Sequence, residues 1–239
     1  MSLWLLLAAH FIADFFLQSA DWAEKKTQKF WYLVGHALVY TVVFALVAFL
    51  CIPAYVVWIP FVIIALSHFI IDWIRVLADK KFTASTSHFT SFLIDQALHI
   101  FIIFTLVCMF DLNGQNKGWI SDLALRIPLE QVLRYALIFL IILDPTSVFV
   151  KKLSSYVSGS ANNSSTKREP PAGSTIGKLE RIIIAILVIC GELGAIGFVL
   201  TAKSLARYKQ LSEKDFAEKY LVGTLSSTAI AIITALLLK

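Results

Sequence analysis

The chain has 239 residues, of which 58% are hydrophobic, and its formal net charge is +5. Soluble domains are about 45–50% apolar, whereas apolar runs of about 20 residues, enough to cross about 30 Å of hydrocarbon, recur along this chain. The composition therefore excludes a soluble globular domain and predicts an all-α, polytopic membrane helical bundle. A positive charge in such a protein is typical of basic cytoplasmic loops, so nucleic-acid binding is not expected.

Six or seven hydrophobic segments are predicted in chain order. The first is short for a membrane span, and it lacks the basic start and cleavage site of a signal peptide, so it should be retained. Pro53 marks a tight turn after the second segment, and Pro145, which has no amide hydrogen, should kink the fifth. The seven candidates are residues 2–18, 30–51, 53–77, 90–111, 132–151, 179–201 and 220–238.

Residues 154–177 differ in kind from the apolar segments. They are rich in Ser, Asn, Gly and Pro, can bury little, and are therefore predicted to form a flexible linker. The linker divides an N-terminal membrane bundle, residues 1–153, from a C-terminal two-helix membrane part, residues 178–239. Within the latter, residues 203–219 mix aromatic and charged side chains and predict a helix lying at the membrane interface. Residues 112–131 are expected to be a polar connection.

The distribution of Lys and Arg predicts the topology. The side that holds loops 19–29, 78–89 and 152–178 and the C-terminus carries thirteen of these residues, and the other side carries eight. Because cytoplasmic loops are enriched in Lys and Arg, the first side is assigned to the cytoplasm.

Ionisable side chains cost roughly 2.5–3.5 kcal/mol each inside a membrane helix, yet this chain concentrates seven His and Asp residues in its first four segments. Six form pairs four residues apart, which places both members on one helix face. The Asp follows the His in segments one and three and precedes it in segment four, which runs in the opposite direction. An aspartate layer about 7 Å deep and a histidine layer about 13 Å deep are therefore expected. The seven residues are His10, Asp14, His36, His68, Asp72, Asp95 and His99.

Neutral imidazole and carboxylate ligands suit a divalent first-row ion, and zinc is the first choice. The favoured interpretation is therefore a metal site near the cytoplasmic face. Three alternatives stay open: each Asp orients its His, the pairs relay protons, or the polar groups only hold the bundle together. Gln18, Tyr40 and Gln96 lie beside the cluster and are expected to support it.

Other polar positions carry weaker signals. Cys51, Cys108 and Cys190 lack metal-ligand spacing and are expected to pack in the core. Asp144 and Glu192 are isolated carboxylates in apolar segments, for which pairing and function are equally favoured.

The stretches LLLAAHFIADFFLQ, GHALVYT, SHFIIDW and FLIDQALH resemble the bacterial integral-membrane family catalogued as domain of unknown function 3307. The resemblance covers roughly residues 3–110, and residues 176–227 resemble the tail of longer members. It implies a location in the bacterial inner membrane, with residues 154–177 and the C-terminus in the cytoplasm if the charge count holds. It implies no reaction.

The leading functional hypothesis is a metal-dependent hydrolase of a lipid or lipid-linked substrate, in which the ion lowers the pKa of its bound water toward about 7. The expected ligands are His10, His68 and His99, with His36 as a fourth ligand or a base and the aspartates as ligands or orienters. The runner-up is a proton or divalent-ion transporter, although the apolar far half of segments one to four weighs against a continuous path. A third hypothesis is a non-enzymatic scaffold or stress-response partner. The lipid bilayer is the expected partner, and a homo-oligomer stays open.

Overall fold

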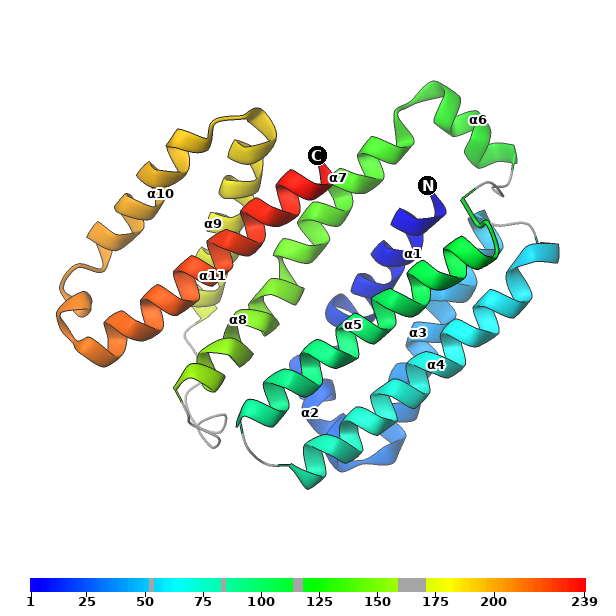
Figure 1. Cartoon of the computed structure of the whole chain (residues 1–239), viewed down its shortest axis with the longest axis horizontal. Helices are drawn as coiled ribbons and strands as arrows, with labels where there is room; N and C mark the ends of the chain where they lie inside the picture. Colours follow the sequence, from blue (N-terminus) through cyan, green and yellow to red (C-terminus); the bar gives the residue numbers. More distant parts are fainter. Residues whose placement is uncertain (52–53, 83–84, 114–117, 159–170) are drawn as a thin grey trace. The chain divides into compact units, whose positions relative to one another are not determined.

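The computed structural model describes residues 1–51, 54–82, 85–113, 118–158 and 171–239 (Figure 1), and the regular structure in these residues is helical, without strands. The all-α prediction is therefore confirmed. The elements are α1 (Ser2–Phe11), the π-helix η1 (Ile12–Phe16), α2 (Ala20–Gln28), α3 (Phe30–Cys51), α4 (Ala54–Lys81), α5 (Ser85–Met109), α6 (Gly118–Arg126), α7 (Leu129–Ile142), α8 (Asp144–Val157), α9 (Pro171–Cys190), α10 (Leu193–Ala206), the 3-10 helix η2 (Gln210–Ser212) and α11 (Lys214–Leu238).

Five helices in the described residues are long and apolar enough to cross a membrane. A sixth span results if the bent pair Ser2–Phe16 and Ala20–Gln28, whose axes differ by 80°, is counted as one. The lower of the two expected numbers of segments is therefore the better one. The five are Phe30–Cys51, Trp58–Lys81, Thr86–Met109, Leu129–Val157 and Lys214–Leu238.

Two of the predicted segments are broken. The expected break near Pro145 is confirmed, because α7 ends at Ile142 and the proline lies in the first turn of α8, where its missing amide hydrogen costs nothing. The prediction of one continuous helix over residues 179–201 is wrong. Gly191 adopts φ +85°, a left-handed conformation that ends α9, and α10 then spans only about 21 Å.

Several predicted connections contain helices. Residues 112–131 include α6, and the basic loop 19–29 is largely α2. The prediction of a single interfacial helix over residues 203–219 is wrong, because the end of α10, η2 and the start of α11 divide that stretch. Helices α8 and α9 also extend into both ends of the predicted linker 154–177. The rest of that linker and the turn at Pro53 lie outside the described residues.

The chain forms two compact units, Met1–Leu137 and Ile138–Lys239, called here the N-terminal and C-terminal units. In the N-terminal unit α3 packs on α4, α4 packs on α5, and α1 packs against both α3 and α5 (Figure 1). In the C-terminal unit α11 packs against α8 and α9, and α10 packs against α9. The division falls before residue 153, where the N-terminal part was expected to end, and the domain assignment stays a prediction.

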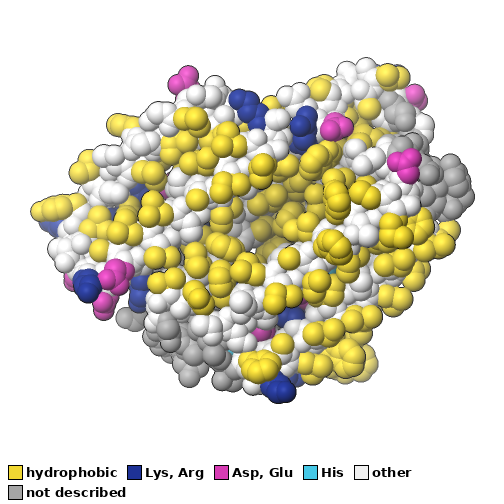
Figure 2. Space-filling model, viewed as in Figure 1, with side chains coloured by type: hydrophobic (Ala, Val, Ile, Leu, Met, Phe, Trp, Pro, Cys, Tyr) yellow, Lys and Arg dark blue, Asp and Glu magenta, His cyan; other side chains and the backbone are white. Residues whose placement is uncertain are grey.

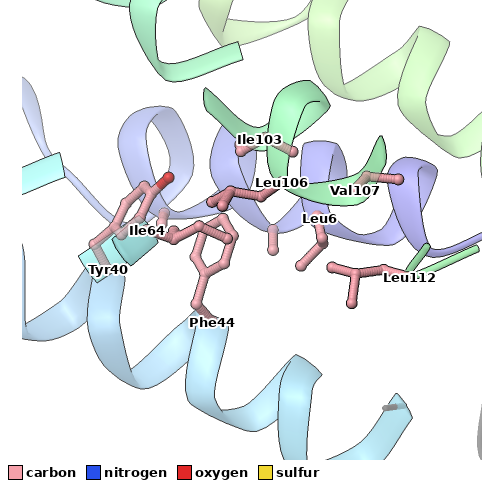
Figure 3. Close-up of a cluster of buried hydrophobic side chains, with 10 residues drawn as sticks. Leu6, Tyr40, Phe44, Ile64, Ile103, Leu106, Val107 and Leu112 are labelled. Carbon is pink, nitrogen blue, oxygen red and sulfur yellow. The ribbon is translucent and has the colours of Figure 1, made fainter. Parts of the chain in front are cut away.

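The core of the N-terminal unit is a cluster of aliphatic and aromatic side chains from α1, α3, α4 and α5. Figure 3 shows Leu6, Phe44 and Ile64 pointing toward one another beneath the α5 side chains Ile103 and Leu106. Tyr40 closes the cluster at one end, where its ring stacks on the imidazole of His68 with ring centroids 3.5 Å apart. The apolar core therefore ends where a polar cluster begins.

The outer faces of the helices are also apolar. Large side chains such as Leu46, Phe49, Phe101 and Phe104 are more than half exposed. Figure 2 shows hydrophobic side chains spread across the viewed face, with charged side chains mostly toward its edges. Water-soluble monomers rarely expose apolar surface on this scale.

Candidate metal centre

Five elements of the N-terminal unit carry the seven predicted site residues. α1 provides His10, η1 provides Asp14, α3 provides His36, α4 provides His68 and Asp72, and α5 provides Asp95 and His99. All four histidines are at most 3% exposed. Direct contacts and the side chain of Gln96 join the seven residues into one buried cluster, so the structure brings together what the spacing grouped. Their role as metal ligands stays a prediction.

Three of these residues form a triangle of potential ligand atoms. His36 Nε2 lies 3.3 Å from His68 Nε2 and 3.4 Å from Asp14 Oδ1, and His68 Nε2 lies 3.8 Å from Asp14 Oδ1. Two ligands at the zinc distance of about 2.0–2.1 Å and at a tetrahedral angle would be about 3.3–3.4 Å apart. The triangle is therefore close to the size that a tetrahedral ion requires.

The carboxylate of this triangle has an unsatisfied atom. Asp14 is 8% exposed, and its Oδ1 is buried and accepts no hydrogen bond from the described residues. Burying such an atom without a partner costs about 1–3 kcal/mol. A bound cation would remove that cost, so the donor set fits a divalent ion.

Asp14 lies in the π-helix, where the amide of Leu17 donates to the carbonyl of Ile12, five residues earlier, at 3.0 Å. Short π-helical turns are rare and frequently occur at functional sites. This local widening alters the helical face on which Asp14 lies relative to His10. The sequence carried no signal for it.

Asp72 lies beside the triangle and is shared with a lysine. Its Oδ2 is 3.5 Å from His36 Nε2 and 3.7 Å from His68 Nε2, and it accepts a hydrogen bond of 2.8 Å from Lys26 Nζ. Lys26 is only 7% exposed. Asp72 can therefore reach a fourth ligand position, but a buried ammonium group now holds the same oxygen.

Helix α2 brings Lys26 to this position. Ser19 accepts a hydrogen bond from the Trp22 amide and begins the helix, and the Trp22 indole donates to the carbonyl of Tyr32 at 2.8 Å. Trp22 also lies against Gly35, where an added Cβ would come within 3.1 Å of the indole. Because residues 19–29 were predicted to form a loop, Lys26 was not expected at the site, although Ser19 is typical of the residue that begins a helix.

His10 is linked to two of the three supporting residues. Its Nε2 donates to the Gln96 side-chain oxygen at 3.3 Å, and its Nδ1 lies 3.3 Å from the Tyr40 hydroxyl. The Gln96 amide nitrogen donates to Asp14 at 3.4 Å and to Asp95 at 3.0 Å. Tyr40 and Gln96 thus contact the cluster as expected. The buried Gln18 Nε2 has no hydrogen-bond partner among the described residues, and its supporting role stays a prediction.

Asp95 and His99 occupy the other side of the cluster. Asp95 forms a 2.8 Å ion pair with Arg75, a residue of α4 that was not among the predicted site residues. His99 Nδ1 donates to the backbone carbonyl of Asp95 at 2.8 Å. A carbonyl can only accept, so the lone pair of the neutral imidazole lies on Nε2, which is buried without a hydrogen-bond partner in the described residues.

The three pairs spaced four residues apart do not form direct hydrogen bonds between their side chains. The closest side-chain oxygen and nitrogen are 3.8 Å apart in His10–Asp14, 3.7 Å in His68–Asp72 and 3.9 Å in Asp95–His99. These separations exceed the usual 2.7–3.2 Å of an N–H···O bond. None of the aspartate side chains therefore holds its own histidine directly, and only Asp95 does so through its backbone carbonyl. Most of the other contacts within the cluster run between helices.

The remaining singled-out residues lie outside the cluster. Asp144 pairs with Lys178 at 2.5 Å, and Glu192 precedes α10 with an exposed side chain. Core packing is confirmed for Cys51, but it is wrong for Cys108 and Cys190, which are exposed.

A comparison with models of protein families matches residues 2–124 to the family described as "Protein of unknown function (DUF3307)". The matched range includes all seven cluster residues together with Lys26 and Arg75. No curated protein and no solved structure matches the chain.

Proposed function

The chain belongs to the DUF3307 family, and we propose that it is a multi-pass membrane protein whose buried His/Asp cluster binds a divalent metal ion and hydrolyses a lipid or lipid-linked substrate. The triangle formed by His36 Nε2, His68 Nε2 and Asp14 Oδ1 carries the proposal, because its dimensions and ligand types suit zinc.

The membrane location is supported by the helices themselves. Five of them are long and apolar enough to span a bilayer, and their outer faces expose large apolar side chains. Exposing this apolar surface to water would be unfavourable in free energy, whereas the hydrocarbon of a bilayer can cover it without that cost. The proposed location is the bacterial inner membrane, with the basic end of α4, at Lys80 and Lys81, facing the cytoplasm.

The proposed roles differ from the expected ligand set, and the distances in the cluster support the change. His36 takes a ligand position with His68 and Asp14, while His10 is held by Tyr40 and Gln96. Three protein ligands would leave a fourth position for water, whose pKa a bound zinc ion would lower toward about 7. His99, with its lone pair on Nε2 and its ring centroid 4.6 Å from that of His68, is the proposed proton acceptor.

A lipid substrate is supported by an apolar cleft between α4 and α5. Its volume is about 310 Å³. Counted at about 1.5 Å per residue, it lies roughly 8–10 Å along the helices from His68 and His99. An acyl chain fits such a surface, and its head group would then face the polar cluster. The lining residues are Ile63, Phe101, Ile102, Thr105, Leu106, Met109 and Phe110.

The same core weighs against transport through this unit. The apolar cluster around Leu6, Phe44 and Ile103 packs directly beyond Tyr40, and these three side chains are at most 3% exposed. An ion or proton crossing the unit would have to leave the histidines and enter this packed hydrocarbon. A one-sided site is what a hydrolase needs.

Elemental analysis of the full chain, purified in detergent without chelator, tests the proposal. We expect about one divalent ion per chain, with zinc preferred over other first-row ions. His36→Ala should lose the ion, while His88→Ala should keep it because His88 contacts Asp79 outside the cluster. A wild-type protein that stays metal-free after incubation with zinc would refute the proposal.

A further inference from the structure

The charges of the cluster are not balanced. Around the ligand triangle two carboxylates, Asp14 and Asp72, face one cation, Lys26, so these groups carry one net negative charge when the histidines are neutral. A bound divalent ion would change this to one net positive charge. Unbalanced buried charge is costly, so the metal-loaded cluster favours a ligand that brings a negative charge.

The two cations of the cluster, Lys26 and Arg75, differ in how they are held. Arg75 is paired with two carboxylates, Asp95 at 2.8 Å and Asp79 at 3.9 Å, and it lies over the ring of Phe92, so its charge is already balanced and its position is fixed. Among the described residues Lys26 pairs with one carboxylate oxygen, Asp72 Oδ2, at 2.8 Å, and that oxygen lies 3.5 Å from His36 Nε2 and 3.7 Å from His68 Nε2. The ammonium group therefore lies at the border of the ligand triangle, on a side chain with four rotatable carbons.

We infer that Lys26 binds the anionic group of the substrate, and that this group is a phosphate ester that bridges the Lys26 ammonium and the bound ion. The inference rests on the proposed metal site and names its substrate class. Lysine and a divalent ion together form a recurrent clamp for phosphoryl oxygens.

The position of Lys26 favours phosphate over other anions. α2 lies at the end of the helices where Lys25 and Lys29 are exposed, the end assigned to the cytoplasmic surface. Phosphate is the anionic group that membrane lipids place at this depth. The same chemistry could be offered by a phospholipid head group or by a soluble phosphate ester, and these two sources can be separated by experiment.

The test measures two affinities that should change in opposite directions. In the zinc-loaded full chain in a neutral detergent, Lys26→Met should weaken binding of inorganic phosphate by about 10–100-fold, the effect of losing one charge-assisted hydrogen bond. The same substitution should tighten zinc binding, because it removes a positive charge beside the ion. A lysine that only stabilised the fold would not produce this opposite pair of changes.

Matched variants keep the result interpretable. Lys26→Arg should retain phosphate binding, and Lys29→Met, which removes an exposed lysine from the same end of α2, should change neither affinity. Titration calorimetry with inorganic phosphate, a short-chain phosphatidylglycerol and the corresponding uncharged diacylglycerol separates the sources. Tighter binding of the phospholipid supports a lipid source, and equal or weaker binding supports a soluble one.

Three results would overturn the inference. If zinc binds but Lys26→Met leaves phosphate affinity unchanged, the anion-binding role fails while the metal site stands. If no zinc binds to the wild type, the proposed function is refuted, and the inference about Lys26 is refuted with it because it depends on the metal site. Equal binding of the uncharged diacylglycerol and the phospholipid would also exclude phosphate as the recognised group.

Discussion

In the C-terminal unit the buried Arg181 has a hydrogen-bond partner for every guanidinium nitrogen. The N-terminal unit, by contrast, buries several polar atoms that have no hydrogen-bond partner among the described residues. Arg181 donates to the carbonyls of Ile142 and Leu143, at the break between α7 and α8, and to Ser147 and Ser227. In the N-terminal unit, Asp14 Oδ1, His68 Nδ1 and His99 Nε2 have no hydrogen-bond partner among the described residues.

This contrast separates a structural use of buried polarity from a functional one. A helix break leaves carbonyl oxygens unpaired, and in an apolar environment an arginine that satisfies them stabilises the fold. Unpaired atoms that are concentrated among histidines and aspartates do not stabilise the fold in this way. They can instead bind a ligand. Glu180 Oε1 and Thr228 Oγ1 are unpaired in the C-terminal unit too, but neither lies in a group of potential metal ligands.

The largest expected effect is the loss of stability when Arg181 is replaced. Arg181→Met should destabilise the protein by about 3–5 kcal/mol, because the Ile142 carbonyl would lose the donor that Arg181 supplies and the hydroxyls of Ser147 and Ser227 would each lose a partner. Thermal unfolding in detergent measures the loss. Lys214→Ala, at an 86% exposed lysine, should cost less than about 1 kcal/mol. Zinc binding should be unchanged in both variants, and loss of zinc in Arg181→Met would show that the two uses of polarity are not separate.

The aspartates should differ in their effect on zinc affinity. Asp14→Asn removes the carboxylate of the ligand triangle and should weaken zinc binding by more than about 100-fold, whereas Asp72→Asn should weaken it by about 10–100-fold, as expected for a group next to the ligands. Competition with a chromogenic chelator measures both. Asp21→Asn, which changes an exposed carboxylate on α2, is the control. A larger loss for Asp72→Asn than for Asp14→Asn would exchange their roles.

Acidification should release the ion without unfolding the C-terminal unit. Histidine ligands bind metal only when neutral, so protons compete with zinc for the imidazole ligands. Zinc retained after dialysis should therefore fall as the pH is lowered. Arg181 stays protonated in acid, so its bonds should persist. Zinc retention that does not change with pH would exclude histidine ligands.

Much of the fold follows from local sequence, because an apolar run of about 20 residues has few alternatives to a membrane-length helix. The same holds for grouping the seven His and Asp residues, since spacing along a helix and chain direction determine their face and depth. The contacts themselves depend on how helices pack against one another. That is why the pairing of Asp95 with Arg75, and of Asp72 with Lys26, could not be predicted. Both cations lie near polar loops, where sequence alone suggests exposure to water.

Segment six shows a different limit. It contains three glycines, of which Gly191 ends α9 with φ +85°, while Gly194 and Gly197 lie within α10. Nothing in the composition distinguishes the three. Only the first adopts a conformation that other residues rarely reach, and this depends on the tertiary position of the hairpin between α9 and α10.

The smallest expected effect tests that hairpin. An alanine at position 191 would meet no atom within 4 Å, so the cost of Gly191→Ala comes from the backbone alone and should be about 1–2 kcal/mol. Gly194→Ala also meets no atom within 4 Å, but it lies in helical backbone and should stabilise by about 0.5–1 kcal/mol. Thermal unfolding of the two variants side by side isolates the backbone term. If both substitutions change the free energy of unfolding in the same direction, the left-handed conformation of Gly191 is not what separates α9 from α10. That result would favour one continuous helix over residues 179–201.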